Sequence, residues 1–195
     1  FCNLLDADEV TICGEESFGT SSHHAREKDG LWAVLAWANV LAATGLSVQQ
    51  LADAHWARYG RHYFVRHDYE ELPAERAEAV MQALASALPT LPGTRFAERE
   101  VTLADEFSYH DRHDGSIATG QGLRIVCGDD ARVVLRLSGT GTRGATLRVY
   151  LERYEREAAS LHWQADVAVA PLASAIDALA GISARTGRRA PDVVT

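Results

Sequence analysis

Residues 136–144 read Arg136-Leu137-Ser138-Gly139-Thr140-Gly141-Thr142-Arg143-Gly144, and the chain continues into Ala145-Thr146-Leu147-Arg148. Glycines let backbone N–H groups approach a ligand closely, while the hydroxyl and guanidinium groups add side-chain donors. A phosphate offers only acceptor oxygens, and the planar fork of an arginine matches two of them at once. The stretch therefore predicts an anion site, although a glycine-rich turn between two strands explains the same residue types equally well.

The length of 195 residues and the hydrophobic content of 47% predict either one large domain or two small domains with a true core. The longest apolar run, 31–43, is shorter than the ~20 residues that span a bilayer, so it predicts a buried helix and no membrane partner. The three cysteines, Cys2, Cys13 and Cys127, show neither a disulfide framework nor a metal-binding spacing. We therefore expect a cytoplasmic protein.

The net charge of −8 argues against general binding of nucleic acid, because a phosphate backbone would be repelled. Against this background five arginines form a local basic concentration. They are Arg124, Arg132, Arg136, Arg143 and Arg148. A small anionic ligand would explain them, and so would a solvated strand face.

Near the beginning of the chain, residues 10–13 predict a short buried strand that runs into Gly14-Glu15-Glu16-Ser17-Phe18-Gly19. In open α/β sheets, ligands bind beyond the carboxyl ends of the strands. A loop with two carboxylates and a hydroxyl at that place predicts recognition of sugar hydroxyls. The alternative is an acidic turn exposed to water.

The polar segment 20–29 contains the adjacent pair His23 and His24, but no further ligand at a recurrent spacing supports a metal site. The helix predicted over 31–43 is apolar around its whole circumference, so we expect a sheet and other helices to cover it on all sides. Ser47 and Gln50 form a capping box for a second helix, over about 48–58.

A new domain is predicted from about Arg61. Its elements are a strand at 62–65, a helix at 74–87 that follows Pro73, strands near 99–107, 122–127, 132–137 and 145–153, and a last helix from Pro171 to about 184. In the strand at 145–153, Leu147, Val149 and Leu151 alternate with Arg148, Tyr150 and Glu152. The aliphatic side chains should be buried, which puts Arg148 on the opposite face, where it can reach the glycine-rich stretch.

Three segments carry a family resemblance. They are Gly14-Glu15-Glu16-Ser17-Phe18-Gly19, then Arg26-Glu27-Lys28-Asp29-Gly30-Leu31-Trp32-Ala33-Val34-Leu35-Ala36-Trp37, and then the stretch from Arg136 to Arg148. Their residues, order and spacing closely resemble those of the phosphoglucomutase family. The similarity continues through Phe107-Ser108-Tyr109-His110-Asp111, Gln121-Gly122-Leu123-Arg124 and Arg185-Thr186-Gly187-Arg188, so it covers essentially the whole chain.

Family members are four-domain enzymes, and the resemblance places this chain at their C-terminal part. It implies an α/β fold class: residues 1–60 are the end of the third domain, a three-layer α/β domain that carries the sugar-binding loop. Residues 61–195 are the fourth domain, a small α+β domain with a mixed sheet, helices packed on it and the phosphate-binding loop. The sequence contains neither a phosphoserine loop of the Thr-Ala-Ser-His-Asn-Pro kind nor an Asp-Gly-Asp-x-Asp-Arg metal loop.

The resemblance also implies a reaction, the interconversion of glucose 1-phosphate and glucose 6-phosphate through a phosphoserine and glucose 1,6-bisphosphate, with Mg²⁺ as cofactor of the complete enzyme. Lys28 would contact the substrate and take part in proton transfer, and Glu15 and Ser17 would bind sugar hydroxyls. The non-reacting phosphate would be held by Arg136, Ser138, Gly139, Thr140, Gly141 and Arg148. The partners implied are a hexose phosphate and the N-terminal domains of the same enzyme, and the chain alone is expected to be inactive.

The sequence departs from the usual family pattern at Ser21, His23 and Arg143, which leaves the loop conformations there open. A second hypothesis is a non-catalytic sugar-phosphate binding or interaction module derived from the same family. A phosphomannomutase or phosphoglucosamine mutase is a nearer alternative, but Glu16 and Phe18 favour glucose.

Overall fold

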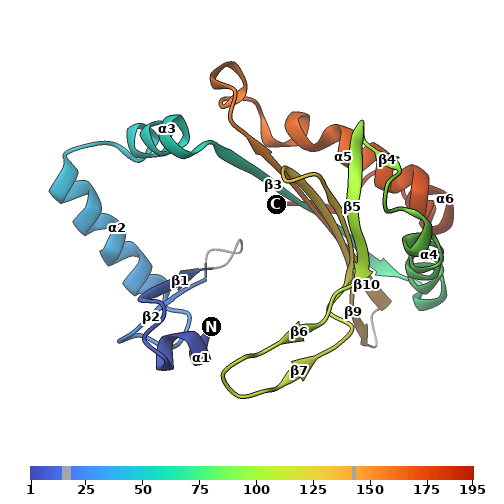
Figure 1. Ribbon diagram of the computed structural model, residues 1–195, viewed down its shortest axis with the longest axis horizontal. Helices are drawn as coiled ribbons and strands as arrows, with labels where there is room; N and C mark the ends of the chain where they lie inside the picture. The colour runs from blue at the N-terminus through green and yellow to red at the C-terminus, as the bar shows by residue number, and fades with distance from the viewer. Residues whose placement is uncertain (15–18, 142–143) are drawn as a thin grey trace. The chain divides into compact units, whose positions relative to one another are not determined.

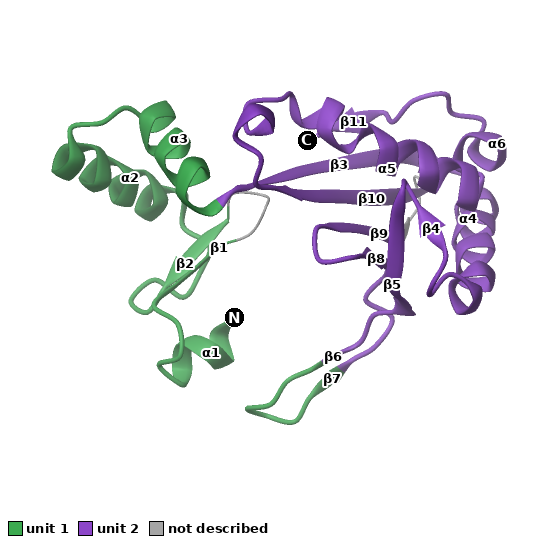
Figure 2. Cartoon of the chain, turned by 45° about the horizontal axis from the view of Figure 1, so that its top comes forward, with its two compact units in different colours: residues 1–59, 110–117 green, residues 60–109, 118–195 purple. Residues whose placement is uncertain are grey.

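The computed structural model describes residues 1–14, 19–141 and 144–195, without the side chain of Thr140. These residues form two compact units (Figure 2). The first unit consists of residues 1–59 and 110–117, and the second of residues 60–109 and 118–195. The first unit combines helices with a small sheet, and the second packs helices on a larger sheet, so the predicted fold class is confirmed.

The strands of the first unit form a hairpin. It consists of β1, Ile12–Gly14, and β2, Thr20–Ser22, which pair antiparallel with Ile12 opposite Ser22. The sequence correctly predicts a strand next to Gly14, but the expectation that it is buried is wrong, because Ile12 is 58% exposed. The reason is that β2 is the only strand paired with β1 among the described residues, so the sheet around Ile12 is only two strands wide.

The helices of the first unit begin and end where local signals place them. They are α1, Cys2–Asp6; α2, Gly30–Thr44; and α3, Val48–Tyr59. The Asp29 carboxylate caps α2 by accepting hydrogen bonds from the N–H groups of Leu31 and Trp32, at 2.9 and 3.1 Å. The capping box before α3 is confirmed: the Ser47 N–H donates to Gln50 Oε1 at 2.9 Å, and the Gln50 N–H donates to Ser47 Oγ at 3.3 Å.

Helix α2 differs from the prediction in its environment. It is apolar on all faces, as predicted, yet none of its side chains is buried, and Leu31, Val34 and Leu35 are 79%, 66% and 63% exposed. The expected covering layers are absent from the part of the chain that the structure describes. A helix with this composition needs such layers, because water is a poor environment for a continuous apolar surface.

Among the described residues, no single helix is long and apolar enough to cross a membrane; only α2 and α3 taken together, across a bend of 81°, reach the required length and composition.

A hairpin from later in the chain joins β6, Tyr109–His110, to β7, Ile117–Ala118. Its residues 110–117 belong to the first unit. The Asn3 side-chain amide donates hydrogen bonds to Asp111 Oδ2 and Asp114 Oδ2 at 3.1 and 2.9 Å, and Arg112 pairs with Glu9. These contacts explain why 110–117 clusters with residues 1–59 (Figure 2).

The second unit is built on a seven-stranded sheet with the strand order β11-β3-β10-β9-β8-β5-β4, in which the described pairs are antiparallel. Its strands are β3, Arg61–Leu72; β4, Arg95–Phe96; β5, Arg99–Glu106; β8, Leu123–Cys127; β9, Ala131–Gly141; β10, Gly144–Glu155; and β11, Val193–Val194. Its helices are α4, Ala74–Ala87; α5, Ala165–Ala180; and α6, Ile182–Thr186, with short 3₁₀ helices at Leu88–Thr90 and Ala158–Ser160. The three α-helices cover one face of the sheet (Figure 1).

Strand alternation divides the side chains of this sheet between two faces. Leu147, Val149 and Leu151 are 0%, 1% and 0% exposed and lie in the core under the helices, as predicted. The alternate residues lie on the opposite face, which we call the open face. Its main side chains are Phe64, Arg66 and Asp68 from β3; Asp105 from β5; Arg124 and Val126 from β8; Arg132, Val134, Arg136 and Ser138 from β9; and Thr146, Arg148, Tyr150 and Glu152 from β10.

The helix predictions in the second unit succeed in one case and fail in another. Helix α4 covers 74–87 after Pro73, as predicted. Helix α5 begins at Ala165, so the expectation that Pro171 opens the last helix is wrong. Proline removes only the hydrogen bond to the carbonyl of Val167, whose side chain is 59% exposed, so water can solvate that turn of the helix.

The described cysteines are free, and Cys127 is buried in the core whereas Cys2 is exposed. Burial raises the pKa of the Cys127 thiol from its ordinary value of 9.0 to about 11. At pH 8 we therefore expect iodoacetamide to label Cys2 rapidly and Cys127 only after unfolding. Labelling of Cys127 in the folded chain as fast as that of Cys2 would contradict its burial.

Because burial raises the pKa of the Cys127 thiol, the free energy of unfolding depends on pH. An unfolded thiol ionises near pH 9.0 and the folded thiol near 11, so the stabilisation is complete below pH 9 and is lost as the pH rises through 11. Urea unfolding at pH 8 and pH 10 measures the loss. The Cys127→Ala variant is the control and should lose less stability over this interval.

Candidate functional site

Arg136 on β9 and Arg148 on β10 lie opposite each other on the open face, and Ser138 lies opposite Thr146 in the next row. Side chains that are directly opposed across antiparallel strands are close neighbours, and like charges in that arrangement repel. The register therefore brings together three residues of the predicted phosphate site. Because Arg136 and Arg148 repel each other, a negative charge beside them would stabilise this arrangement.

Two other arginines of the basic concentration are neutralised within the sheet. Arg124 donates from Nε and Nη2 to the two carboxylate oxygens of Asp105, at 2.9 and 2.7 Å, and this hydrogen bonding raises the pKa of Arg124. Arg132 forms an ion pair with Glu152, which also lies 2.9 Å from Nδ1 of His62. Arg143, the fifth arginine, lies outside the described residues.

Arg136 and Arg148 are not neutralised in this way. Arg136 is exposed and makes no hydrogen bond or ion pair with another described residue. Arg148 makes no hydrogen bond either, and its Nε is buried at 3.8 Å from Asp68 Oδ2. The uncompensated positive charge of the open face is therefore concentrated on this pair.

Asp68 completes the row and Arg66 lies in the next row, opposite Tyr150; sequence reasoning missed both. Asp68 lies opposite Arg148 across β3 and β10 and is only 4% exposed. Arg66 donates from Nε and Nη2 to Asp68 Oδ1 and Oδ2, at 2.9 and 3.0 Å. The available signal was an arginine and an aspartate two positions apart in a long strand, because such residues share one face.

The other predicted residues of the glycine-rich stretch are described only in part. Gly139 has a φ of 68°, which favours glycine, and no atom lies within 4 Å of the position that a Cβ would occupy. Gly141 pairs with Gly144 at the end of β9, and the side chain of Thr140 lies outside the described part. Glu15 and Ser17, predicted to bind a sugar, also lie outside it.

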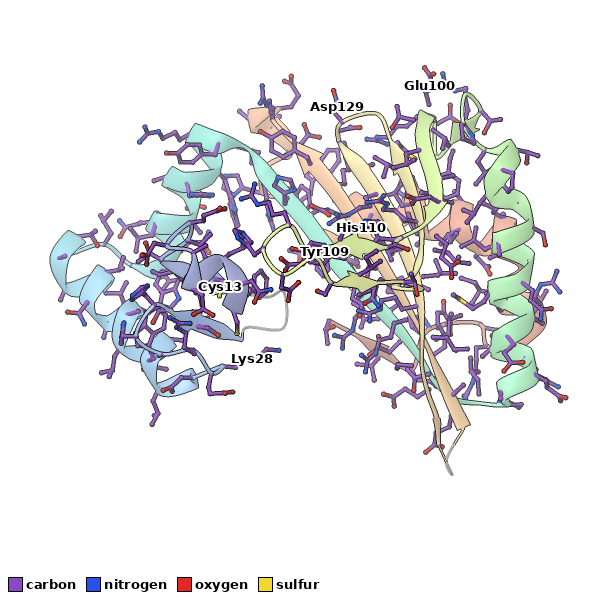
Figure 3. The ribbon with its side chains drawn as sticks, turned by 60° about the horizontal axis from the view of Figure 1, so that its bottom comes forward. Cys13, Lys28, Glu100, Tyr109, His110 and Asp129 are labelled. Atoms are coloured by element: carbon purple, nitrogen blue, oxygen red, sulfur yellow. The ribbon has the colours of Figure 1, made fainter. Side chains whose placement is uncertain are left out.

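Lys28 belongs to the first unit, where it is exposed (Figure 3). A Cβ on Gly19 would come within 2.7 Å of Lys28 Cδ, so the aliphatic part of Lys28 lies against the last residue of the predicted sugar loop. His24 accepts a hydrogen bond from Trp32 Nε1 at 2.7 Å. In the described ranges, no group of three His, Cys, Asp or Glu side chains could hold a metal ion.

Pockets lie at different places on the second unit, and two of them adjoin arginines of the open face. A pocket of 140 Å³ adjoins Arg136 and is also lined by Glu106, Gln121 and Gly122. A pocket of 290 Å³ lies at the β8–β9 turn, which Asp129 marks in Figure 3. Its charged lining consists of Asp129, Asp130, Glu152, Arg132 and His62, so carboxylates outnumber guanidinium groups there. The smaller pocket has one guanidinium group, that of Arg136, and one carboxylate, that of Glu106.

Gly122 gives Arg136 its space. Its φ is 140°, and a Cβ there would come within 2.9 Å of Arg136 Cγ and 3.0 Å of the Leu135 carbonyl oxygen. The Gly122→Ala variant should lose about 1 to 3 kcal/mol of unfolding free energy, because the backbone cannot yield easily. Urea unfolding measures the loss.

Gly93→Ala is the matched control. Gly93 also has a positive φ, 82°, but no atom lies within 4 Å of its Cβ position. We expect a smaller loss, of about 1 kcal/mol, from backbone strain alone. Equal losses in the two variants would show that contact with Arg136 and Leu135 is unimportant.

Comparison with known proteins places both units in one family. The family model described as "Phosphoglucomutase-1, C-terminal domain" matches residues 61–192. The model described as "Phosphoglucomutase/phosphomannomutase, alpha/beta/alpha domain III" matches residues 1–59.

Individual relatives agree with these matches. The chain is 53% identical over 195 residues to "Phosphoglucomutase" of Rhizobium radiobacter and 46% identical over 201 residues to "Phosphoglucomutase-1" of Homo sapiens, and in each case 100% of this chain covers 36% of the relative. A crystal structure of the Paramecium phosphoprotein pp63/parafusin, a phosphoglucomutase in its open form, superposes with a TM-score of 0.89 and 37% identity, over 100% of this chain and 34% of that one. The chain thus spans about a third of the length of these relatives. With its whole length matched by the third-domain and C-terminal-domain models, the chain belongs to the phosphoglucomutase family and corresponds to the C-terminal part of its members.

Proposed function

We propose that the chain is the substrate-binding C-terminal part of a phosphoglucomutase that interconverts glucose 1-phosphate and glucose 6-phosphate through a phosphoserine and glucose 1,6-bisphosphate. The relatives are named phosphoglucomutases, which favours an enzyme over a separate sugar-phosphate binding module. One observation on the open face carries the proposal: Arg124 and Arg132 are neutralised by carboxylates, whereas Arg136 and Arg148 lie side by side without hydrogen bonds.

This pair is suited to a phosphate dianion. Charge-assisted hydrogen bonds from two guanidinium groups would offset their mutual repulsion, and Ser138 would add a hydroxyl donor. Gly139, Thr140 and Gly141 would contribute further donors from the loop. The smaller pocket beside Arg136 would give the phosphate a concave site.

The task of this site is to hold the phosphate that does not react. In a reaction through glucose 1,6-bisphosphate, the sugar must be accepted in two orientations, so a clamp remote from the reacting oxygen must bind either phosphate. Such positioning supplies much of the barrier reduction in phosphoryl transfer. Glu15 and Ser17 would bind the sugar hydroxyls, and Lys28 would contact the substrate and take part in proton transfer.

The remaining chemistry is assigned to other parts of the enzyme. The described residues do not provide a cluster suited to Mg²⁺, so we propose that the metal and the phosphoserine belong to the N-terminal domains. Mg²⁺ would neutralise charge on the transferred phosphoryl group. An assay of the 195-residue chain should accordingly show no turnover.

The two parts of the chain are assigned to two domains of the complete enzyme. Residues 1–60 would be the C-terminal part of the third domain, and residues 61–195 the fourth domain. The exposed apolar surface of α2 supports this assignment, because the rest of a third domain would cover Leu31, Val34 and Leu35. The names of plant relatives, "Phosphoglucomutase, cytoplasmic 1" of Zea mays among them, favour a cytoplasmic location.

Titration of the chain with inorganic phosphate tests the site. The Arg136→Ala variant should weaken binding about tenfold or more, because it removes a charge-assisted hydrogen bond. Arg132→Ala is the matched control: it removes the same charge from the same strand and face, but Glu152 already neutralises that charge, so we expect a loss of about twofold at most. Binding can be followed at the Gly139 amide by NMR.

Two results would contradict the proposal. One is unchanged phosphate binding in the Arg136→Ala variant. The other is an equal loss in both variants, since that would indicate attraction by the overall charge of the sheet face and no defined site.

A further inference from the structure

Asp68 combines properties that a merely structural carboxylate does not need. It is 4% exposed although it lies on the open face, and a buried carboxylate must be paired. The two hydrogen bonds from Arg66, at 2.9 and 3.0 Å, already provide that pairing. Yet Asp68 also stands directly opposite Arg148 in the strand register.

Arg148 forms an ion pair with Asp68. Its Nε is buried and has no hydrogen-bond partner, and the carboxylate oxygen Oδ2 of Asp68 lies 3.8 Å away. No other ion pair of Arg148 exists in the described part of the chain. Asp68 therefore lies on the Nε side of the guanidinium group, while the terminal nitrogens remain available to a ligand.

The backbone under Asp68 is held on both sides. On one side β10 pairs with β3, and Arg148 faces Asp68. On the other side β11 pairs with β3, and the Asp192 N–H donates to the Asp68 carbonyl at 2.9 Å. The Arg66 N–H donates to the Thr195 carbonyl at 2.7 Å, so Arg66 and Asp68 are fixed together.

We propose that Asp68 is a positioning residue of the phosphate site: its carboxylate, neutralised by Arg66, orients Arg148 toward the bound phosphate. This inference rests on the proposed function, because it assumes that Arg136 and Arg148 bind the phosphate. Asp68 itself does not touch the ligand, and its negative charge alone would repel it.

Because of this repulsion, the direction in which phosphate affinity changes in an Asp68 variant tests the proposal. Replacing Asp68 by asparagine removes one negative charge next to the site, so electrostatic attraction alone predicts tighter binding of phosphate. Loss of orientation predicts weaker binding. For Asp68→Asn we expect phosphate affinity to fall about tenfold, the effect of about one charge-assisted hydrogen bond.

Asp105→Asn is the matched control. Asp105 lies on the same open face and accepts two hydrogen bonds from Arg124, at 2.9 and 2.7 Å, as Asp68 does from Arg66. The substitution makes the same change in charge without touching Arg148. Phosphate affinity should stay the same or rise slightly in this variant.

A double variant covers the case in which Asp68→Asn leaves Arg66 unpaired and unfolds the chain. Arg66→Gln combined with Asp68→Asn removes both charges and keeps the net charge of the chain. We expect the same tenfold loss of phosphate affinity, together with a displaced Nε–Hε NMR signal of Arg148. Unchanged or tighter binding in the folded single or double variant would overturn the proposal.

The outcome also separates this inference from the proposed function. One outcome is that the unmodified chain and the Asp68→Asn variant bind phosphate equally well, while the Arg136→Ala variant binds it weakly. In that case only the role of Asp68 is wrong. If Arg136→Ala leaves binding unchanged, the phosphate site itself is wrong and the inference falls with it.

Discussion

Two guanidinium groups stand side by side on this sheet because β9 and β10 pair in a register that sets Arg136 opposite Arg148. The core holds that register: Leu147, paired with Leu137, and Val149, paired with Leu135, lie under the helices. A slip by one residue would turn the arginines into the core and the aliphatic side chains to the open face, which burial strongly disfavours. The hydrophobic core of the second unit thus maintains a repulsive pair that an anion can relieve.

The carboxylates on the open face determine where the positive charge remains. Asp105 and Glu152 neutralise Arg124 and Arg132, while Asp68 is already engaged by Arg66 and stays 3.8 Å from Arg148. The open face carries five arginines. Carboxylates pair with Arg66, Arg124 and Arg132, so the site is limited to the other two. The local charge is positive although the whole chain carries −8, which favours a small anionic ligand over a long nucleic acid.

Prediction from sequence succeeded where the signal was local. The period of the apolar residues and the flanking proline gave α4, and Ser47 and Gln50 gave the start of α3. The alternation in 145–153 correctly placed Arg148 on the face of the sheet away from the buried aliphatic residues. Family resemblance, carried by glycine-rich and charged motifs, singled out Arg136 and Ser138, which the structure brings next to Arg148.

Prediction from sequence missed contacts that are not local, and it interpreted two local patterns wrongly. The pairing of Asp68 with Arg148 joins positions far apart in the chain, and Asp105 neutralises Arg124 from another strand, so neither shows in a run of sequence. The start of α5 was missed because Pro171 was interpreted as a helix opener. The covering of α2 was predicted from composition alone, and composition does not reveal which part of a protein provides the covering layers.

The free positive charge of the open face resides on Arg136 and Arg148. The most direct measurement follows the Nε–Hε NMR signals of all arginines while sulfate is added at constant ionic strength. We expect the signals of Arg136 and Arg148 to move together with one binding constant, while those of Arg124 and Arg132 stay in place because Asp105 and Glu152 hold them. Equal movement of all four signals, or movement of Arg124 and Arg132 alone, would contradict it.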